Sequence, residues 1–266
     1  MPISFLAALA VAAYLVATLL AALPALRDSK LPRSLNLGVA AVAVVAHAVC
    51  VLGAHRGGMD LHFFAALSFV ALLIAATTLL VNLARPVAAL GVIVFPLAAA
   101  LLGVDAWIAP PTQPNSMGWQ IKLHVIVALL GYALLSVSAV LALLLLAQER
   151  ALRTRRVAGH WLRVLPPLTL TEALMFRLVG AGFILLTVTL LSGVLFVENL
   201  FAQHLVHKTL LSIVAWLVFG TLLLGRWRFG WRGRRAVHLL LCGMGVLLLA
   251  FFGSKFVLEL LLARTP

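Results

Sequence analysis

Three histidines, His47, His124 and His207, lie in three separate apolar segments of membrane-spanning length. His47 lies about seven residues, or roughly 10 Å, from one end of its segment, and the other two lie no deeper from the corresponding ends. An ionisable side chain at such a depth is costly and marks a candidate functional site. Neutral imidazole is a good axial ligand for haem iron, and an apolar pocket just below a membrane surface suits a macrocycle whose propionates prefer water. The histidines therefore predict a non-covalently bound, b-type haem, without selecting which two of them bind the iron.

Each histidine also has a structural interpretation, because an imidazole in a membrane helix can simply hydrogen-bond a neighbouring helix. A lysine near the end of the sequence raises the same question. Lys255 lies in an apolar run, where it could meet an anion such as a haem propionate or pair with Glu259 one helical turn later. Arg56 and Lys122 are rival cations for the propionate. The predicted cofactor site consists of His124, His47, His207 and Lys255.

The elements that must carry these residues are membrane-spanning helices. Hydrophobic residues make up 64% of the 266 residues, charged residues make up 10%, and the mean hydropathy is +1.17, which excludes a soluble enzyme. A helix needs about 20 apolar residues to cross a bilayer, and eight segments meet this requirement. The predicted fold is an all-α bundle of eight transmembrane helices that forms one polytopic domain over residues 1–266, with no soluble domain. The spans are expected near residues 3–23, 35–54, 61–81, 86–107, 119–147, 173–197, 203–224 and 236–262.

The distribution of charge predicts how these spans are oriented. Of the 20 Lys and Arg residues, 15 lie on the side of the first, third, fifth and seventh loops. Basic residues gather on the cytoplasmic side, so both termini are expected in the periplasm. The net charge of +13 is explained in the same way, and the lipid bilayer, not nucleic acid, is the expected partner.

Local signals place the sixth span and exclude several kinds of chemistry. Thr169 followed by Glu172 is typical of a capping box that opens a helix, with Thr169 as the N-cap. The sequence has no Walker-type glycine loop, no H-E-x-x-H and no G-x-S-x-G. Its two cysteines, Cys50 and Cys242, form no C-x-x-C motif. Hydrolytic, phosphoryl-transfer and dithiol chemistry therefore find no support.

Six short runs carry a further signal: KLHVIVALLGYA at 122–133, LLLAQER at 144–150, PPLTLTE at 166–172, HKTLLSIVAW at 207–216, GWRGRR at 230–235 and FGSKF at 252–256. Together they resemble the cytochrome c assembly protein family, and most nearly its YpjD/HemX-like branch. The resemblance covers most of the chain. It implies a multi-pass protein of the bacterial inner membrane that handles haem in its periplasmic half and works with cytochrome c maturation or other membrane proteins. In this resemblance His124, His207 and His47 match histidines of the family.

One departure from the family pattern limits the prediction. The Trp-rich periplasmic segment W-G-x-x-W-x-W-D is missing, and the loop at 198–203 is too short to hold it. A role in haem binding, export or regulation is therefore predicted, and synthetase activity is not. Two alternatives stay open: a haem-free transporter or accessory subunit of a transport complex, which would need broken helices or a midplane polar site, and a quinol-oxidising cytochrome b-like enzyme. The second would need histidine pairs in both membrane halves, whereas the inner half offers only His238.

Overall fold

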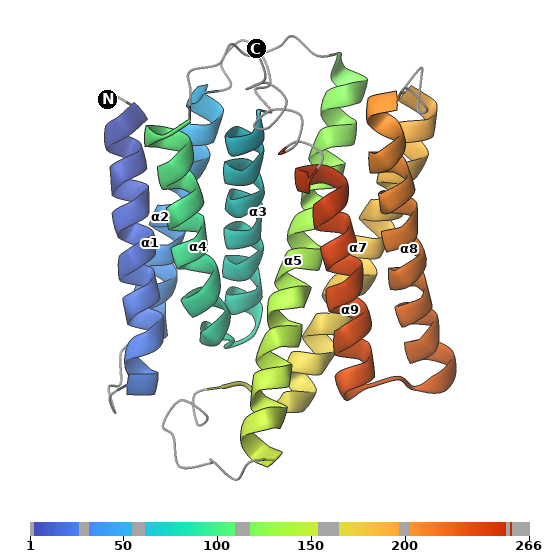
Figure 1. Ribbon diagram of the computed structural model, residues 1–266. Helices are drawn as coiled ribbons and strands as arrows, with labels where there is room; N and C mark the ends of the chain where they lie inside the picture. Colours follow the sequence, from blue (N-terminus) through green and yellow to red (C-terminus); the bar gives the residue numbers. More distant parts are fainter. Residues whose placement is uncertain are drawn as a thin grey trace. The chain divides into compact units, whose positions relative to one another are not determined.

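The fold is helical throughout the part of the chain that the structure describes. The computed structural model describes residues 3–26, 32–54, 62–109, 118–153, 165–196, 203–253 and 256. Within these residues all regular structure is helix, and eight helices are long and apolar enough to cross a membrane (Figure 1). The predicted all-α membrane fold with eight spans is confirmed.

Contacts between helices divide the chain into two compact units. Unit 1 comprises Met1–Ser116 and Ala147–Leu170, and unit 2 comprises Met117–Leu146 and Thr171–Pro266. Helix α5, Trp119–Arg153, contributes residues to both units. The expectation that residues 1–266 form one domain stays a prediction, and each unit is described by itself below.

Unit 1 is built around four helices, each of which packs on two others. They are α1 (Ile3–Leu26), α2 (Arg33–Ala54), α3 (Phe63–Ala84) and α4 (Ala88–Trp107). Helix α1 packs on α2 and α4, and α3 also packs on α2 and α4 (Figure 1). Small residues let these backbones approach closely, as expected in a membrane interior where helices gain little from hiding apolar surface. One core cluster consists of Ala7, Ala10, Ala46, Cys50 and Leu102.

Unit 2 contains most of α5 together with α7 (Leu168–Phe196), α8 (Gln203–Phe229) and α9 (Gly233–Leu248). Helix α9 passes directly into a short π-helix, Leu249–Gly253. A glycine sets the approach of α7 to α5, because a Cβ atom added at Gly182 would lie 2.7 Å from Cγ of Leu135. Helices α5 and α7 therefore lie next to each other, and both supply side chains to the cavity described below.

The helices of unit 2 are longer than the apolar runs that predicted them. Helix α7 begins at Leu168 instead of residue 173, and α8 continues to Phe229 instead of stopping near residue 224. Backbone hydrogen bonding continues a helix past the point where its side chains become polar, so hydropathy marks the membrane interior better than the helix end. Of the predicted eighth span, 236–262, the residues after Gly253 other than Phe256 lie outside the described residues.

The predicted capping box at the start of α7 is wrong. The helix begins at Leu168, so Thr169 lies inside its first turn and is not the N-cap. Glu172 instead forms ion pairs with two arginines at the α8–α9 connection, Arg226 and Arg232. A charge-assisted pair with a guanidinium is stronger than a bond to a backbone amide, and only the tertiary fold supplies those arginines.

Candidate functional site

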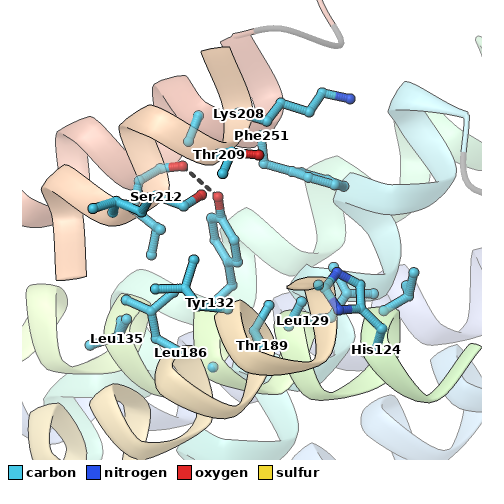
Figure 2. Close-up of a pocket in the computed structure, with 18 of the residues that line it drawn as sticks. His124, Leu129, Tyr132, Leu135, Leu186, Thr189, Lys208, Thr209, Ser212 and Phe251 are labelled. Carbon is cyan, nitrogen blue, oxygen red and sulfur yellow. Dashed lines mark hydrogen bonds between the residues drawn. The ribbon is translucent and has the colours of Figure 1, made fainter. Parts of the chain in front are cut away.

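Unit 2 encloses a cavity of about 280 Å³ between α5, α7, α8 and the α9/π-helix segment (Figure 2). This volume lies close to the lower end of the range of about 300–1,000 Å³ that is typical of small-molecule sites. Most of the wall is aliphatic. The polar or aromatic side chains that line it are His124, Tyr132, Thr189, Lys208, Thr209, Ser212 and Phe251. An apolar cavity with a few polar groups is the usual form of a cofactor or ligand site.

His124 is hydrogen-bonded to a serine of the neighbouring helix α7. The Ser192 hydroxyl donates to the carbonyl oxygen of Thr189 at 3.0 Å, which uses its only proton. With that proton on Thr189, Ser192 Oγ, 2.8 Å from Nδ1 of His124, accepts a hydrogen bond from that nitrogen, the tautomer that satisfies both contacts. A neutral imidazole protonated at Nδ1 carries its lone pair on Nε2, and Nε2 is then the nitrogen able to bind a metal.

The opposite wall of the cavity is tied to α5 by a tyrosine. The buried Tyr132 hydroxyl donates to the carbonyl oxygen of Leu247, the dashed line in Figure 2. Leu247 lies in α9, two residues before the start of the π-helix, whose widened turn places Ala250 and Phe251 on the cavity wall. Tyr132 also packs against the rings of Phe251 and Phe252, with centroids 5.8 and 5.9 Å away. Single π-turns are frequent at functional sites, and this one shapes the wall of the cavity.

Lys208 supplies the positive charge of the cavity lining, together with the hydroxyls of Thr209 and Ser212 from the same helix. Thr209 and Ser212 lie across the cavity from His124, which α5 carries, and the Lys208 side chain runs past the ring of Phe251 (Figure 2). The arrangement places an imidazole on one side of an apolar cavity and a cation with hydroxyl donors on another. It can hold a flat apolar ligand that carries a metal ion and acidic substituents.

Of the three predicted site residues that the structure describes, one lines this cavity. His124 lines it, whereas His207 is exposed on α8 and is not among the lining residues. Lys255 lies outside the described residues. His47 belongs to unit 1 and is not among the residues that line this cavity.

His47 is fully buried in unit 1 and hydrogen-bonds through both ring nitrogens. Nδ1 lies 3.2 Å from the Tyr14 hydroxyl of α1, and Nε2 lies 3.2 Å from the Ser68 hydroxyl of α3. A neutral imidazole donates with one nitrogen and accepts with the other, and a hydroxyl can take either role. His47 thus joins α1, α2 and α3, and iron binding would require it to give up one of these two bonds.

Sequence reasoning missed the residues that define the cavity around His124. Ser192 and Tyr132 carry no signal in the sequence, because a hydroxyl in an apolar helix gives no indication of its partner. Lys208 gave a usable signal, since it follows His207 directly and lies one helical turn from Ser212. A cation one turn from a hydroxyl in an apolar segment indicates a polar stripe on one helix face.

A second polar cluster in unit 2 joins the start of α7 to the α8–α9 connection. Arg232 donates to Oε2 of Glu172 from Nη2 and Nε, at 2.9 and 3.1 Å, and its Nε also lies 3.2 Å from Oε1. Arg226 approaches Oε1 of the same carboxylate at 3.4 Å. Hydrogen bonding to Glu172 raises the pKa of the Arg232 guanidinium, so this guanidinium stays charged. Arg226 also lies 4.6 Å above the ring of Phe176. This cluster holds helix ends together and contains no cavity-lining residue.

The fold and the cavity define the class of this protein: a multi-pass helical membrane protein with a ligand-sized cavity inside one helical unit. Comparison with known proteins identifies the family. The family model described as Cytochrome C assembly protein matches residues 29–262, and the chain belongs to this family. The family predicted from the six sequence runs is confirmed.

The curated relatives include bacterial inner-membrane proteins. The chain is 39% identical to the inner membrane protein YpjD of Escherichia coli K12 over 52% of both chains. It is 40% identical to an uncharacterized 28.8 kDa protein of Azospirillum brasilense over 58% of this chain and 57% of that one. A cytochrome c biogenesis protein CcsA of Synechococcus sp. JA-2-3B'a(2-13) is 26% identical over 63% of both chains.

These matches fix the location of the protein and the extent of its similarity. The chain spans about half the length of the first curated relatives it matches. No solved structure matches the chain. With eight membrane-spanning helices and relatives of this kind, the protein is a multi-pass protein of the bacterial inner membrane.

Proposed function

We propose that this protein binds a b-type haem non-covalently in the cavity of unit 2, with Nε2 of His124 as an axial ligand, and handles haem for cytochrome c maturation. The observation that carries the proposal is the hydrogen bond from His124 to Ser192. It holds Nδ1 protonated in a side chain that lines an apolar cavity, and so reserves Nε2 for a metal.

The rest of the cavity fits the chemistry of haem. Aliphatic residues of α5 and α7, such as Leu129 and Leu186, offer apolar surface to a macrocycle. Lys208 offers a cation, and Thr209 and Ser212 offer hydroxyl donors, for two propionates. A bound haem supplies an iron centre that changes between two oxidation states, while the chain supplies the ligand, the apolar surface and the compensating charge.

The role in maturation rests on the family. The matched relatives include proteins named cytochrome c biogenesis protein CcsA, and the family model carries the same association. The Trp-rich segment expected of a synthetase is missing from the sequence. Holding or passing on haem therefore agrees better with this chain than covalent attachment of haem to a cytochrome.

The other predicted ligands stay predictions. His207 is exposed on α8, in the turn that carries Lys208, and it remains a candidate for a second axial position. Lys255, proposed as a partner of a propionate, lies outside the described residues. His47 is fully engaged by Tyr14 and Ser68, so a bond to iron would leave a buried hydroxyl without its partner.

The test is an absorbance spectrum of the detergent-purified protein, oxidised and dithionite-reduced, after expression with a haem precursor. The expected result is a Soret band with sharp reduced α and β bands, lost in His124→Ala. His238→Ala is the matched control, because His238 is an exposed histidine on α9 that does not line the cavity. No band in the wild type after haem titration, or an unchanged spectrum in His124→Ala, would contradict the proposal.

A further inference from the structure

Unit 1 has a cavity of its own, where one end of each of α1, α2, α3 and α4 meets the others. Its volume is about 240 Å³. Leu20, Leu37 and Leu79 line its inner part, and the buried ring of Phe95 contributes to its wall. Arg33, Asn36 and Asn82 bring polar groups to the helix ends. Among the described residues that line it there is no acidic side chain.

Arg33 brings a positive charge to this cavity in a defined position. From the start of α2, its Nη2 donates to the carbonyl oxygens of Asn82 and Leu83, at the end of α3; the bond to Leu83 measures 3.2 Å. Both bonds use one of three guanidinium nitrogens. A guanidinium presents five N–H donors in a fork that matches a phosphate, and Arg33 lines a cavity whose described lining residues include no acid.

The two asparagines differ in how they are satisfied. Asn82 Oδ1 accepts the backbone N–H of Val87 at 3.0 Å, which holds the turn between α3 and α4. Asn36 Oδ1 is buried, and it has no hydrogen-bond partner among the described residues. Buried acceptors are nearly always paired, because an unpaired acceptor loses its hydrogen bonds to water and gains none in the protein. The Asn36 oxygen is therefore open to a donor that the described residues do not supply, and a bound molecule can supply one.

We propose that this cavity binds the headgroup of a membrane glycerophospholipid that carries an N–H or O–H donor beside its phosphate, as phosphatidylethanolamine does. The phosphate meets the Arg33 guanidinium, and the headgroup donor meets Asn36 Oδ1. The apolar inner wall takes the methylene groups next to the glycerol. A cation, an unpaired acceptor and apolar walls in one cavity are complementary to this chemistry and to no purely apolar ligand.

The two polar contacts make different predictions for closely matched lipids. Phosphatidylcholine keeps the phosphate and the zwitterionic charge of phosphatidylethanolamine, but its quaternary ammonium has no N–H. Arg33 binds both headgroups, whereas Asn36 discriminates between them. A hydrogen bond to a charged donor is expected to favour phosphatidylethanolamine by about tenfold.

The experiment is a lipid titration of the delipidated, detergent-purified full chain, followed by native mass spectrometry. The wild type should bind dioleoyl-phosphatidylethanolamine about tenfold tighter than dioleoyl-phosphatidylcholine. Asn36→Leu should bind the two lipids equally. Arg33→Gln should lower the affinity for both lipids by about tenfold and keep their ratio. Arg85→Gln, which removes an exposed cation next to the cavity-lining Pro86, is the control and should change neither.

Two further measurements keep the proposal falsifiable. Arg33 also bonds the end of α3, so its substitution could disturb the fold. Leu20→Trp fills the cavity without touching that contact, and it should lower the affinity for both lipids while the protein stays folded. Inorganic phosphate at millimolar concentration should not displace the lipid, and displacement would assign the site to a soluble phosphate ester. Equal affinity of the wild type for both lipids, or unchanged discrimination in Asn36→Leu, would overturn the proposal and assign the Asn36 oxygen to water alone.

Discussion

Two histidines at similar predicted depths have opposite environments in the two units of this protein. His47 in unit 1 is completely buried, and hydroxyls from two other helices occupy both of its nitrogens. His124 in unit 2 is bonded through Nδ1 to Ser192 and lines a cavity of about 280 Å³. His47 therefore joins neighbouring helices, whereas His124 is held by one hydrogen bond at the wall of a cavity.

The difference teaches how a structural histidine can be separated from a candidate ligand in a membrane helix. Both residues satisfy the rule that a buried polar group needs a partner. A ligand also needs one nitrogen held by the protein and one nitrogen left for a metal, next to room for the cofactor. His124 meets these conditions, and His47 meets only the first.

The largest expected effect concerns haem affinity. His124→Ala should weaken haem binding by more than about 100-fold, because it removes a direct ligand, and loss of an outer-shell partner alone costs about 10–100-fold. His47→Ala should leave the spectrum of the haem-bound protein unchanged. Haem titration monitored at the Soret band measures both. The reverse pattern would assign the iron to unit 1 and invert the comparison.

The next effect concerns stability and runs in the opposite direction. His47→Ala should lower the free energy of unfolding by about 2–3 kcal/mol, because it leaves two buried hydroxyls unpaired and creates a cavity. His207→Ala, at an exposed position, should lower the free energy of unfolding by less than about 0.5 kcal/mol. Denaturant unfolding in detergent micelles measures both variants. A His47→Ala protein as stable as His207→Ala would show that the network contributes no stability.

A smaller effect tests the orientation of His124. Ser192→Ala should weaken haem binding by about tenfold, because the ring loses the acceptor that holds its tautomer. In ¹⁵N NMR of histidine-labelled protein without haem, the wild type should show His124 protonated at Nδ1, and the variant should lose this preference. Ser212→Ala removes another hydroxyl of the cavity lining and should preserve the tautomer. An unchanged tautomer in Ser192→Ala would remove the physical basis for assigning Nε2 to iron.

The smallest effect compares two buried tyrosines. Tyr132→Phe in unit 2 and Tyr14→Phe in unit 1 each remove one buried hydrogen bond, and each should lower the free energy of unfolding by about 1 kcal/mol. Only Tyr132→Phe should also change haem affinity, since Tyr132 lines the cavity and bonds the carbonyl of Leu247 next to the π-helix. Unfolding curves and haem titrations of both variants give this comparison. If both variants changed haem affinity equally, the bond from Tyr132 to Leu247 next to the π-helix would have no specific role in haem binding.

The sequence predicted the fold in detail because the bilayer imposes strict conditions on length and hydropathy. Eight apolar runs became eight helices, since backbone groups inside a membrane must be satisfied within each segment. The ends were less certain, and α5 and α8 extend into polar residues that hydropathy had excluded. The Thr169–Glu172 motif failed for a related reason: a local pattern competed with arginines more than 50 positions away along the chain.

The candidate site could be predicted only in part. The rarity of ionisable residues in apolar helices selected His124, which lines a cavity, but the same criterion also selected His47 and His207. Nothing in the sequence shows that Ser192 faces one histidine while Tyr14 and Ser68 surround another. Pairs such as His124 and Ser192, 68 positions apart, are made by helix packing.

The sequence by itself therefore determined the class of the protein, its eight spans and its family. Hydropathy, charge and short motifs are local properties of the chain, so they can be recognised without knowing how the helices pack. Only the tertiary structure decided which nitrogen of which histidine is already bonded, where the cavities lie, and which lysine and hydroxyls share one with His124. The physical reason is that an imidazole is defined chemically by its two hydrogen-bond partners, and in a helical membrane protein those partners come from other helices.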